Sequence, residues 1–291
     1  MKYISQNGTH QPINQAGLSV YNRGYQYGDA VFETIKVKHQ LILFWEDHYL
    51  RLMASMRIMR MEIPMNFTME YLQEKIVELI AINDLADKVN RVKIIVHRSE
   101  GGLYTPKQRG VEFIIFAEEI EELFTIKENH SYEVGLYKDH YVTPDLLSTL
   151  KSNNRLINVL GSIFAEENNF KNCLLLNTNK MAIESLNANI FMVNGTTIST
   201  PPLTDGCLNG IMRLQILKLL KKNSDYAIEE TSISPFQLQK ADELFLTNTI
   251  SGIIPITKYK KKEYITKTSL QLQKLLQQEI KKMGINGNLM E

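Results

Sequence analysis

The chain has 291 residues, of which 44% are hydrophobic and 22% charged, as in an ordinary soluble globular protein with room for two domains. The 33 basic and 32 acidic residues give a formal charge of +1, which argues against nucleic acid or an anionic membrane as a partner. The cysteines and histidines lack the spacing of a metal site, the N-terminus lacks the apolar segment of a signal peptide, and no apolar run could cross a bilayer. A cytoplasmic protein without a metal is therefore expected.

The first part of the chain alternates strand-like and helix-like segments after a turn-rich lead. The predicted elements are a hairpin of strands 31–37 and 41–45, helices 45–61 and 69–85, and strands 92–98 and 111–119. A loop, SEGGLYTPKQRG, separates the last two strands. Two helices between strands predict an α/β or α+β domain over residues 1–120, followed by an interdomain linker at 121–128 where the composition becomes acidic.

The second part, residues 129–291, is predicted to form a larger domain that also mixes helices and strands. Its expected elements are a helix after Lys151, strands 173–178 and 189–193, helix 210–223, strand 243–249 and a helix near 269–283. The last residues, INGNLME, are expected to fray.

Lys151 stands just before the helix expected in TLKSNNRLINVLGSIFAEE. Leu156, Leu160, Ile163 and Phe164 share one face of this helix, and Ser152, Asn153 and Asn154 could each cap it. A cation there opposes the positive end of the helix dipole. Lys151 is thus either an ordinary surface lysine or a lysine placed for chemistry.

Three further stretches could carry chemistry, although each alone has an ordinary structural explanation. LNGIMR (208–213) runs through a glycine into a helix, whose free N–H groups could bind an anion. The polar run 247–252 follows a strand and is either an ordinary turn or part of a phosphate site. Glu184 is either an exposed turn residue or a carboxylate held inside, against a protonated heterocycle nitrogen.

Together these stretches resemble the ordered motifs of the class IV aminotransferases, the fold type IV enzymes that use pyridoxal 5′-phosphate. YNRGYQYGDAVFETIKV and HYLRL are similar to the family's opening, and LTNTISGIIPI to its last motif, so that the similarity runs from Tyr21 to Ile256. The resemblance implies a smaller N-terminal α/β domain and a larger C-terminal domain with a β pseudo-barrel flanked by helices. It also implies a homodimer.

The resemblance assigns a role to each candidate residue. Lys151 would bind the cofactor covalently and then act as the proton-transferring base, with a pKa lowered by the helix dipole. Glu184 would pair with the pyridine nitrogen, which makes the ring a stronger electron sink.

The remaining roles concern the phosphate, the ring and the substrate. Arg51 would hold the phosphate, because a guanidinium matches its geometry. The backbone N–H groups of Ile211 and Met212 and the hydroxyl of Thr249 would complete the phosphate site. Leu208 would lie against the cofactor ring, and Tyr27 would reach the substrate.

The reaction within the family depends on the residues that face the substrate. Leu156 replaces the tyrosine that branched-chain aminotransferases show five places after the lysine, and Leu103 and Thr105 replace the Arg-x-His pair of D-amino-acid aminotransferases. LKSNNRL, LNGIMR and RSEGGLY are more similar to aminodeoxychorismate lyase, although the late arginine of that loop is missing near Leu103. Arg98 or Lys107 could bind the substrate carboxylate in its place.

The predicted activity is therefore conversion of aminodeoxychorismate to 4-aminobenzoate and pyruvate, a step of folate synthesis. An amino-acid aminotransferase acting on branched-chain or D-amino acids is the alternative, because both reactions use the same cofactor residues. A non-catalytic protein that keeps the fold is a third possibility, against which the presence of both Lys151 and Glu184 argues.

Overall fold

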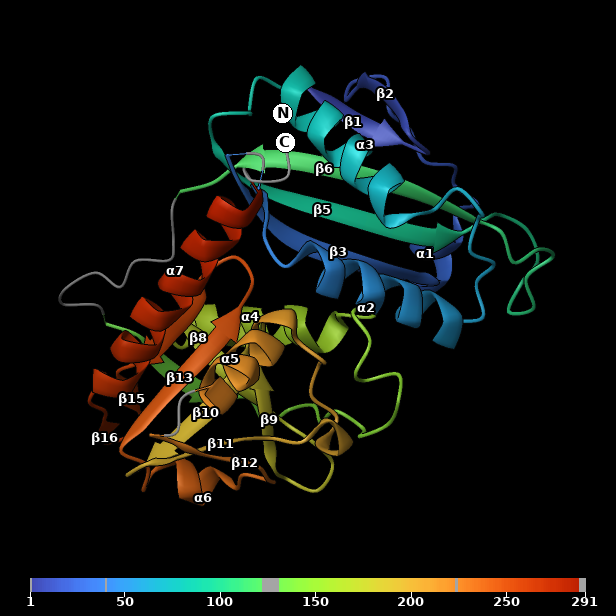
Figure 1. Ribbon diagram of the computed structural model, residues 1–291. Coiled ribbons are helices and arrows are strands. Elements are labelled where there is room, and N and C mark those ends of the chain that lie inside the picture. The colour runs from blue at the N-terminus through green and yellow to red at the C-terminus, as the bar shows by residue number, and fades with distance from the viewer. Residues whose placement is uncertain (1, 40, 122–130, 223–224, 288–291) are drawn as a thin grey trace. The chain divides into compact units, whose positions relative to one another are not determined.

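The computed structural model describes residues 2–39, 41–121, 131–222 and 225–287, and the chain divides into two compact units (Figure 1). The first unit comprises Met1–Glu122 and Lys151–Asn154, and the second comprises Leu123–Leu150 and Arg155–Glu291. The short segment 151–154 thus belongs to the first unit, whereas the sequence suggested one continuous second domain. The expected linker, apart from Glu121, and the chain end beyond residue 287 lie outside the described residues.

The first unit is built on a six-stranded sheet with the order β2-β1-β6-β5-β3-β4, in which neighbouring strands are antiparallel. Its strands are β1 (Tyr3–Gln6), β2 (Thr9–Pro12), β3 (Ala30–Lys38), β4 (Leu41–Ile42), β5 (Val89–Arg98) and β6 (Val111–Glu119). Its helices are α1 (Arg23–Tyr27), α2 (Trp45–Ile58) and α3 (Met69–Ile82).

One face of this sheet forms the core of the unit. Alternate residues of β3 and β5, such as Val31, Ile35, Val92 and Ile94, are buried with the apolar residues of α2 and α3 in one cluster. Successive side chains of a strand point to opposite faces, so Phe32 on β3 lies on the face away from this cluster. One face of the sheet therefore packs into the core, and the side chains of the opposite face, such as Phe32, lie outside that core.

The predicted strands and helices of the first unit are confirmed to within a few residues, with two corrections. Strand 41–45 is wrong beyond Ile42, because Phe44 adopts a left-handed conformation with φ of 55° and α2 begins at the next residue. The lead is not merely turn-rich, because β1 and β2 form a hairpin through Asn7 and Gly8, both with positive φ. Asn-Gly is the preferred sequence of such a turn.

The second unit is built on a ten-stranded sheet that branches at one strand. The order is β12-β11-β10-β9-β8-β7-β15-β16, and β13 pairs with both β10 and β14. Its strands are β7 (Glu133–Leu136), β8 (Asn172–Leu176), β9 (Ala182–Ser185), β10 (Asn189–Asn194), β11 (Thr197–Thr200), β12 (Ala227–Glu230), β13 (Glu243–Asn248), β14 (Gly252–Ile256), β15 (Lys258–Tyr259) and β16 (Lys262–Glu263). Its helices are α4 (Leu156–Glu167), the 3₁₀ turn η1 (Leu203–Asp205), α5 (Ile211–Lys222), α6 (Pro235–Leu238) and α7 (Lys267–Gly287).

The long helices of the second unit cover the sheet, with α4 on β8, α7 on β13 and β14, and α5 against β12, β13 and α7. The sheet curls because β10 has three partners, β9, β11 and β13. Branching of this kind gives a β pseudo-barrel flanked by helices. Several of its short strands, including β7, β9, β12 and β14, were not predicted, because strands of four or five residues are too short to show a clear hydrophobic period.

Helix α4 starts later than expected and buries only part of its apolar face. Arg155 occupies the N-cap position without a side-chain capping bond, so the predicted caps are wrong. Leu160 and Phe164 pack into the core, whereas Leu156 and Ile163 are 69% and 47% exposed. The helix dipole acts mainly within the first turn, and Lys151 lies five residues before Leu156, so the expected effect of the dipole on this lysine is not supported.

Candidate functional site

Lys151 is fixed to the sheet of the first unit through its own backbone. The Phe32 N–H donates a hydrogen bond to the Lys151 carbonyl at 2.8 Å, and the Asn153 N–H donates to the Ala30 carbonyl at 3.0 Å. Ser152 forms an isolated β-bridge with Val31 between these two bonds. The lysine therefore has a rigid backbone attached to β3, which is the kind of support that a catalytic side chain needs.

The Lys151 ammonium lies against the ring of Phe32, and a second lysine shares that ring. The distance from Nζ to the ring centre is 4.6 Å for Lys151 and 4.7 Å for Lys93 on β5. Burial, and next the charge of Arg91, lower the pKa of Lys93. The amines of Lys151 and Lys93 therefore both lie against the Phe32 ring, on the face of the sheet away from the core. Sequence reasoning missed Lys93, because the register of β3 against β5 was needed to place it beside Phe32.

Arg51, the expected phosphate ligand, belongs to a buried charged cluster with Glu33 and His48. Glu33 accepts from Arg51 Nε at 2.8 Å and from Arg51 Nη2 at 2.5 Å, and it contacts His48 Nδ1 at 2.7 Å. Glu33 and His48 are almost fully buried, and the Arg51 side chain is 10% exposed. Because Glu33 engages one edge of the guanidinium, the orientation of Arg51 is fixed from the core side of β3.

The ionisation of this cluster follows from its burial and its pairing. Burial alone would raise the pKa of Glu33, but the charge of Arg51 and hydrogen bonds from His48 and Arg51 lower it to about 2. Burial lowers the pKa of His48, against the opposing effect of its bond to Glu33. A neutral His48 therefore donates to an ionised Glu33 near neutral pH. Neither residue was singled out from the sequence, because a carboxylate in a strand gives no sign of its partner on a helix.

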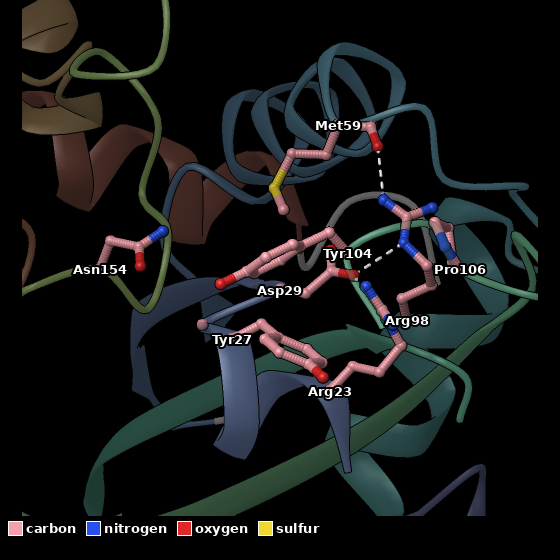
Figure 2. Close-up of a pocket in the computed structure, with 9 residues that line it drawn as sticks. Arg23, Tyr27, Asp29, Met59, Arg98, Tyr104, Pro106 and Asn154 are labelled. Carbon is pink, nitrogen blue, oxygen red and sulfur yellow. Dashed lines mark hydrogen bonds and ion pairs between the residues drawn. The ribbon is translucent and has the colours of Figure 1, made fainter. Parts of the chain in front are cut away.

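Tyr27 and Arg98, the expected substrate residues, line a cavity of about 290 Å³ within the first unit (Figure 2). Arg98 Nε donates to Asp29 Oδ2 at 2.9 Å, and its Nη1 and Nη2 donate to the carbonyls of Arg60 and Met59 at 3.1 and 2.6 Å. Much of the guanidinium is therefore engaged within the protein. The cavity is lined by Arg23, Tyr27, Gly28, Asp29, Met59, Arg98, Tyr104, Pro106 and Asn154.

In the second unit, Glu184 lies inside β9 and is 7% exposed, so it is not an exposed turn residue. Its Oε2 accepts a hydrogen bond from the Leu208 N–H at 2.8 Å, and Asn189 Nδ2 donates to the Leu208 carbonyl at 2.9 Å. Glu184 and Asn189 are opposite each other in the β9–β10 pair. Two neighbouring strands therefore fix both backbone polar groups of Leu208, which was expected beside the cofactor ring. Asn189 was not predicted.

Ile211 and Met212 form the first turn of α5, as the anion-site prediction requires, and the glycine before them has a steric reason. A Cβ on Gly210 would lie 1.9 Å from Asn189 Oδ1. The N–H groups of a first helical turn lack partners within the helix, so they are available to an anion. Thr249 follows β13 in a turn in which Asn248 Oδ1 accepts from the N–H groups of Ile250 and Ser251.

The structure thus groups the predicted residues into two sets, each within one unit. Lys151, Arg51, Tyr27 and Arg98 belong to the first unit, and Glu184, Leu208, Ile211, Met212 and Thr249 to the second. Lys107, the other candidate for the substrate carboxylate, is exposed in the loop after β5. Among the described residues, no cluster of three or more His, Cys, Asp or Glu side chains could hold a metal. No helix in the described part of the chain has the length and apolarity needed to span a membrane.

The chain is similar to known proteins over most of its length. The family model of amino-transferase class IV matches residues 30–259, well over half of the chain. D-Alanine aminotransferase of Bacillus licheniformis is 27% identical over 86% of this chain and 86% of its own length. Aminodeoxychorismate lyase of Vibrio harveyi is 26% identical over 86% of this chain and 87% of its own length.

A solved structure shows the same fold. Branched-chain amino acid aminotransferase of Thermobaculum terrenum, in its pyridoxal-phosphate form, superposes with a TM-score of 0.82 and 23% sequence identity. The superposition covers 96% of this chain and 94% of that one. The mixed α/β architecture with a pseudo-barrel is therefore confirmed. The chain belongs to aminotransferase class IV, the fold type IV family of enzymes that use pyridoxal 5′-phosphate.

Proposed function

We propose that the chain is a cytoplasmic aminodeoxychorismate lyase, which converts 4-amino-4-deoxychorismate to 4-aminobenzoate and pyruvate. The observation that carries the proposal is the pair of amines at Phe32, because Lys151 can transfer a proton while Lys93 binds a carboxylate of an anionic substrate. The sequences LKSNNRL, LNGIMR and RSEGGLY, which are similar to the lyase motifs, favour this reaction over transamination.

The residues present fit pyridoxal phosphate chemically. Glu184 is a buried carboxylate suited to a protonated ring nitrogen, and Lys151 is an amine on a rigid backbone. Gly210 allows the Asn189 side chain, which holds Leu208, to approach the start of α5, and Arg51 supplies a guanidinium oriented by Glu33. We assign the phosphate to Arg51, to the N–H groups of Ile211 and Met212 and to Thr249, and the ring face to Leu208.

In the proposed reaction the bound cofactor supplies an electron sink for the substrate carbon that carries the amino group. The Lys151 amine removes the proton from that ring carbon. The electron pair of the C–H bond forms a ring double bond, while the ether C–O bond breaks and its electrons leave with the enolpyruvyl group. That group takes up a proton and becomes pyruvate, and the ring becomes aromatic. Tyr27 and Arg98 border the cavity on the substrate side.

An amino-acid aminotransferase is the second candidate, because the D-alanine aminotransferase relative is as similar as the lyase. In that reaction Lys151 would likewise be the residue that removes and returns the proton. The deciding experiment supplies aminodeoxychorismate to cofactor-loaded protein and measures 4-aminobenzoate and pyruvate together. Equal, repeated release of both products supports the lyase. Absence of both, with turnover of D- or branched-chain amino acids and 2-oxoglutarate, would make the chain an aminotransferase.

Lys93 provides a test of how the substrate is bound. Lys93→Met keeps most of the side-chain volume but removes the charge that we assign to a substrate carboxylate. A hydrogen bond to a charged group contributes about 1.5–3 kcal/mol, so we expect KM to rise roughly 10- to 100-fold with a smaller change in kcat. Steady-state kinetics measure both, with Lys107→Met as the matched loop variant. If KM rose only in Lys107→Met, we would assign the binding of the substrate carboxylate to Lys107 and not to Lys93.

We also propose a homodimer, supported by an apolar stripe on α4. Leu156, Val159 and Ile163 follow one another at helical spacing and are 69%, 52% and 47% exposed. Placing a charge in this stripe by Val159→Asp is expected to convert the dimer to monomers, measured by light scattering. Met65→Asp, at a residue that is 98% exposed on the first unit, is the control. A monomeric wild-type protein would contradict the proposal.

A further inference from the structure

We propose that Arg23, held by Asp29, is a positioning residue that fixes the backbone of the loop between β5 and β6 and so sets the substrate cavity. The loop, residues 99–110, is called the β5–β6 loop below. This inference rests on the proposed function, in which the cavity faces the substrate. Neither Arg23 nor Asp29 was assigned a role from the sequence.

Arg23 is buried and directs one side of its guanidinium at the loop backbone. Its Nη1 lies 3.2 Å from the carbonyl oxygen of Gly101, 3.3 Å from that of Gly102 and 2.6 Å from that of Leu103. The residue is only 3% exposed, so water does not compete effectively for these contacts. Arg23 Nη1 is thus within hydrogen-bond distance of three successive carbonyl oxygens, and the shortest of these contacts is to Leu103.

Asp29 fixes Arg23 from the other side and links it to α2. Asp29 Oδ2 accepts from Arg23 Nε and from Arg98 Nε, both at 2.9 Å. Arg98 in turn donates to the carbonyls that follow α2, at Met59 and Arg60. Figure 2 shows the Arg98 contacts with Asp29 and Met59 at the cavity wall. One carboxylate therefore ties the loop, through two guanidinium groups, to the end of a core helix.

The loop has a tight turn that depends on this backbone geometry. Gly101 and Gly102 have φ of 108° and 80°, and a Cβ on Gly102 would lie 2.2 Å from the Thr105 carbonyl oxygen. Gly102 and Pro106 form an isolated β-bridge across the turn. Leu103 and Tyr104, at the tip, are 77% and 89% exposed. The side chains of Leu103 and Tyr104 are therefore held by few contacts within the protein.

The same contacts determine the shape of the cavity. The Tyr104 ring lies 5.8 Å from the ring of Tyr27, and the Arg23 guanidinium carbon lies 5.0 Å from the Tyr27 ring centre. All three residues line the cavity. Because Arg23 binds carbonyl oxygens, it fixes the loop whatever side chains the loop carries. Tyr104, the tip residue that lines the cavity, can then influence which substrate binds on a backbone that Arg23 fixes.

Arg23→Lys tests this role, because lysine keeps the charge opposite Asp29 but lacks the fork of donors. We expect hydrogen exchange at the backbone N–H groups of residues 101–105 and 107 to become about ten times faster, which corresponds to the loss of about 1.4 kcal/mol of hydrogen bonding. We also expect KM to rise about tenfold while kcat changes less than about twofold, since substrate positioning is weakened and the base is retained. Asp29→Asn should act in the same direction.

Arg213→Lys is the matched control. Arg213 is 4% exposed in the second unit, where it donates to the Pro201 carbonyl and to Glu230. Its substitution should lower thermal stability without accelerating exchange at 101–107. Unchanged exchange at these amides in folded Arg23→Lys would overturn the inference, as would faster exchange with an unchanged KM. Absence of both lyase and aminotransferase activity in the wild-type protein would defeat the proposed function, and the exchange data alone would then decide whether Arg23 holds the loop.

Discussion

Lys151→Ala is expected to abolish most of the activity without unfolding the protein. The substitution removes the amine that we assign to cofactor attachment and to proton transfer, while the backbone bonds of residue 151 to β3 can be kept. Loss of a positioned general base alone costs on the order of 10²- to 10⁴-fold in kcat. Turnover of aminodeoxychorismate, or of amino acids if the chain is an aminotransferase, measures this loss.

A second measurement separates loss of the base from loss of structure. After treatment with pyridoxal phosphate and borohydride, intact wild-type protein should retain the added mass of the cofactor on the peptide that contains Lys151. Lys151→Ala should retain no mass at that peptide, and its far-UV circular dichroism should match that of the wild type. Lys138→Ala, at an exposed lysine, is the control. Labelling of another lysine, with activity kept in Lys151→Ala, would refute the assignment.

Glu33→Gln is expected to destabilise the first unit strongly. The substitution leaves Arg51 buried without this counter-ion, and one amide oxygen replaces the two carboxylate oxygens that accept from Arg51 and His48. Breaking a buried ion pair from one side costs about 3–5 kcal/mol, because the remaining charge is desolvated and uncompensated. Denaturant unfolding measures the change. Glu118→Gln, in the exposed pair with Arg91, should cost less than about 1 kcal/mol. Similar costs for the two variants would contradict the assignment of Glu33 as a buried partner.

The dependence of this stability on pH follows from the two lowered pKa values. Each group binds its proton less tightly in the folded protein than in the unfolded chain. The contribution of each group to the free energy of unfolding is therefore fully present above its pKa in the unfolded chain. This pKa is about 6.5 for His48 and about 4.5 for Glu33. The contribution is lost as the pH falls, and for Glu33 the loss continues to a pH of about 2. In Glu33→Gln, unfolding should depend less on pH below 4.5.

The sequence predicts the elements of the first unit better than those of the second, for physical reasons. Helices α2 and α3 are long enough to show a helical period, and β3, β5 and β6 alternate on a half-buried sheet. In the second unit, β8 and β10 were predicted as continuous apolar runs, but β7, β9 and β14 have only four or five residues each, too few for a period to be recognised. Pairing of these strands depends on residues far apart in the chain, which local patterns do not specify.

The candidate site divides in a similar way. Lys151, Glu184, Arg51 and the start of α5 are recognisable because their motifs resemble those of a family. The residues that orient them are not, since Glu33 meets Arg51 only when α2 packs on β3, and Asn189 meets Leu208 only through the β9–β10 register. Arg23 binds the loop through backbone carbonyls, which leave no mark in the sequence of the loop. Residues that orient a site residue in this way can be identified only from the three-dimensional structure.

The return of residues 151–153 to β3 also has a consequence for the solubility of fragments. Beyond the short pairing with β4, the outer side of β3 would present unpaired backbone groups at Ala30 and Phe32 without that segment. Open strand edges of this kind recruit further strands and lead to aggregation. A fragment ending near residue 120 would lack this cover, even though its core would be complete. The segment that carries Lys151 thus also covers a sheet edge, so truncation before residue 151 would remove the lysine that we propose as the base and would also expose this edge to aggregation.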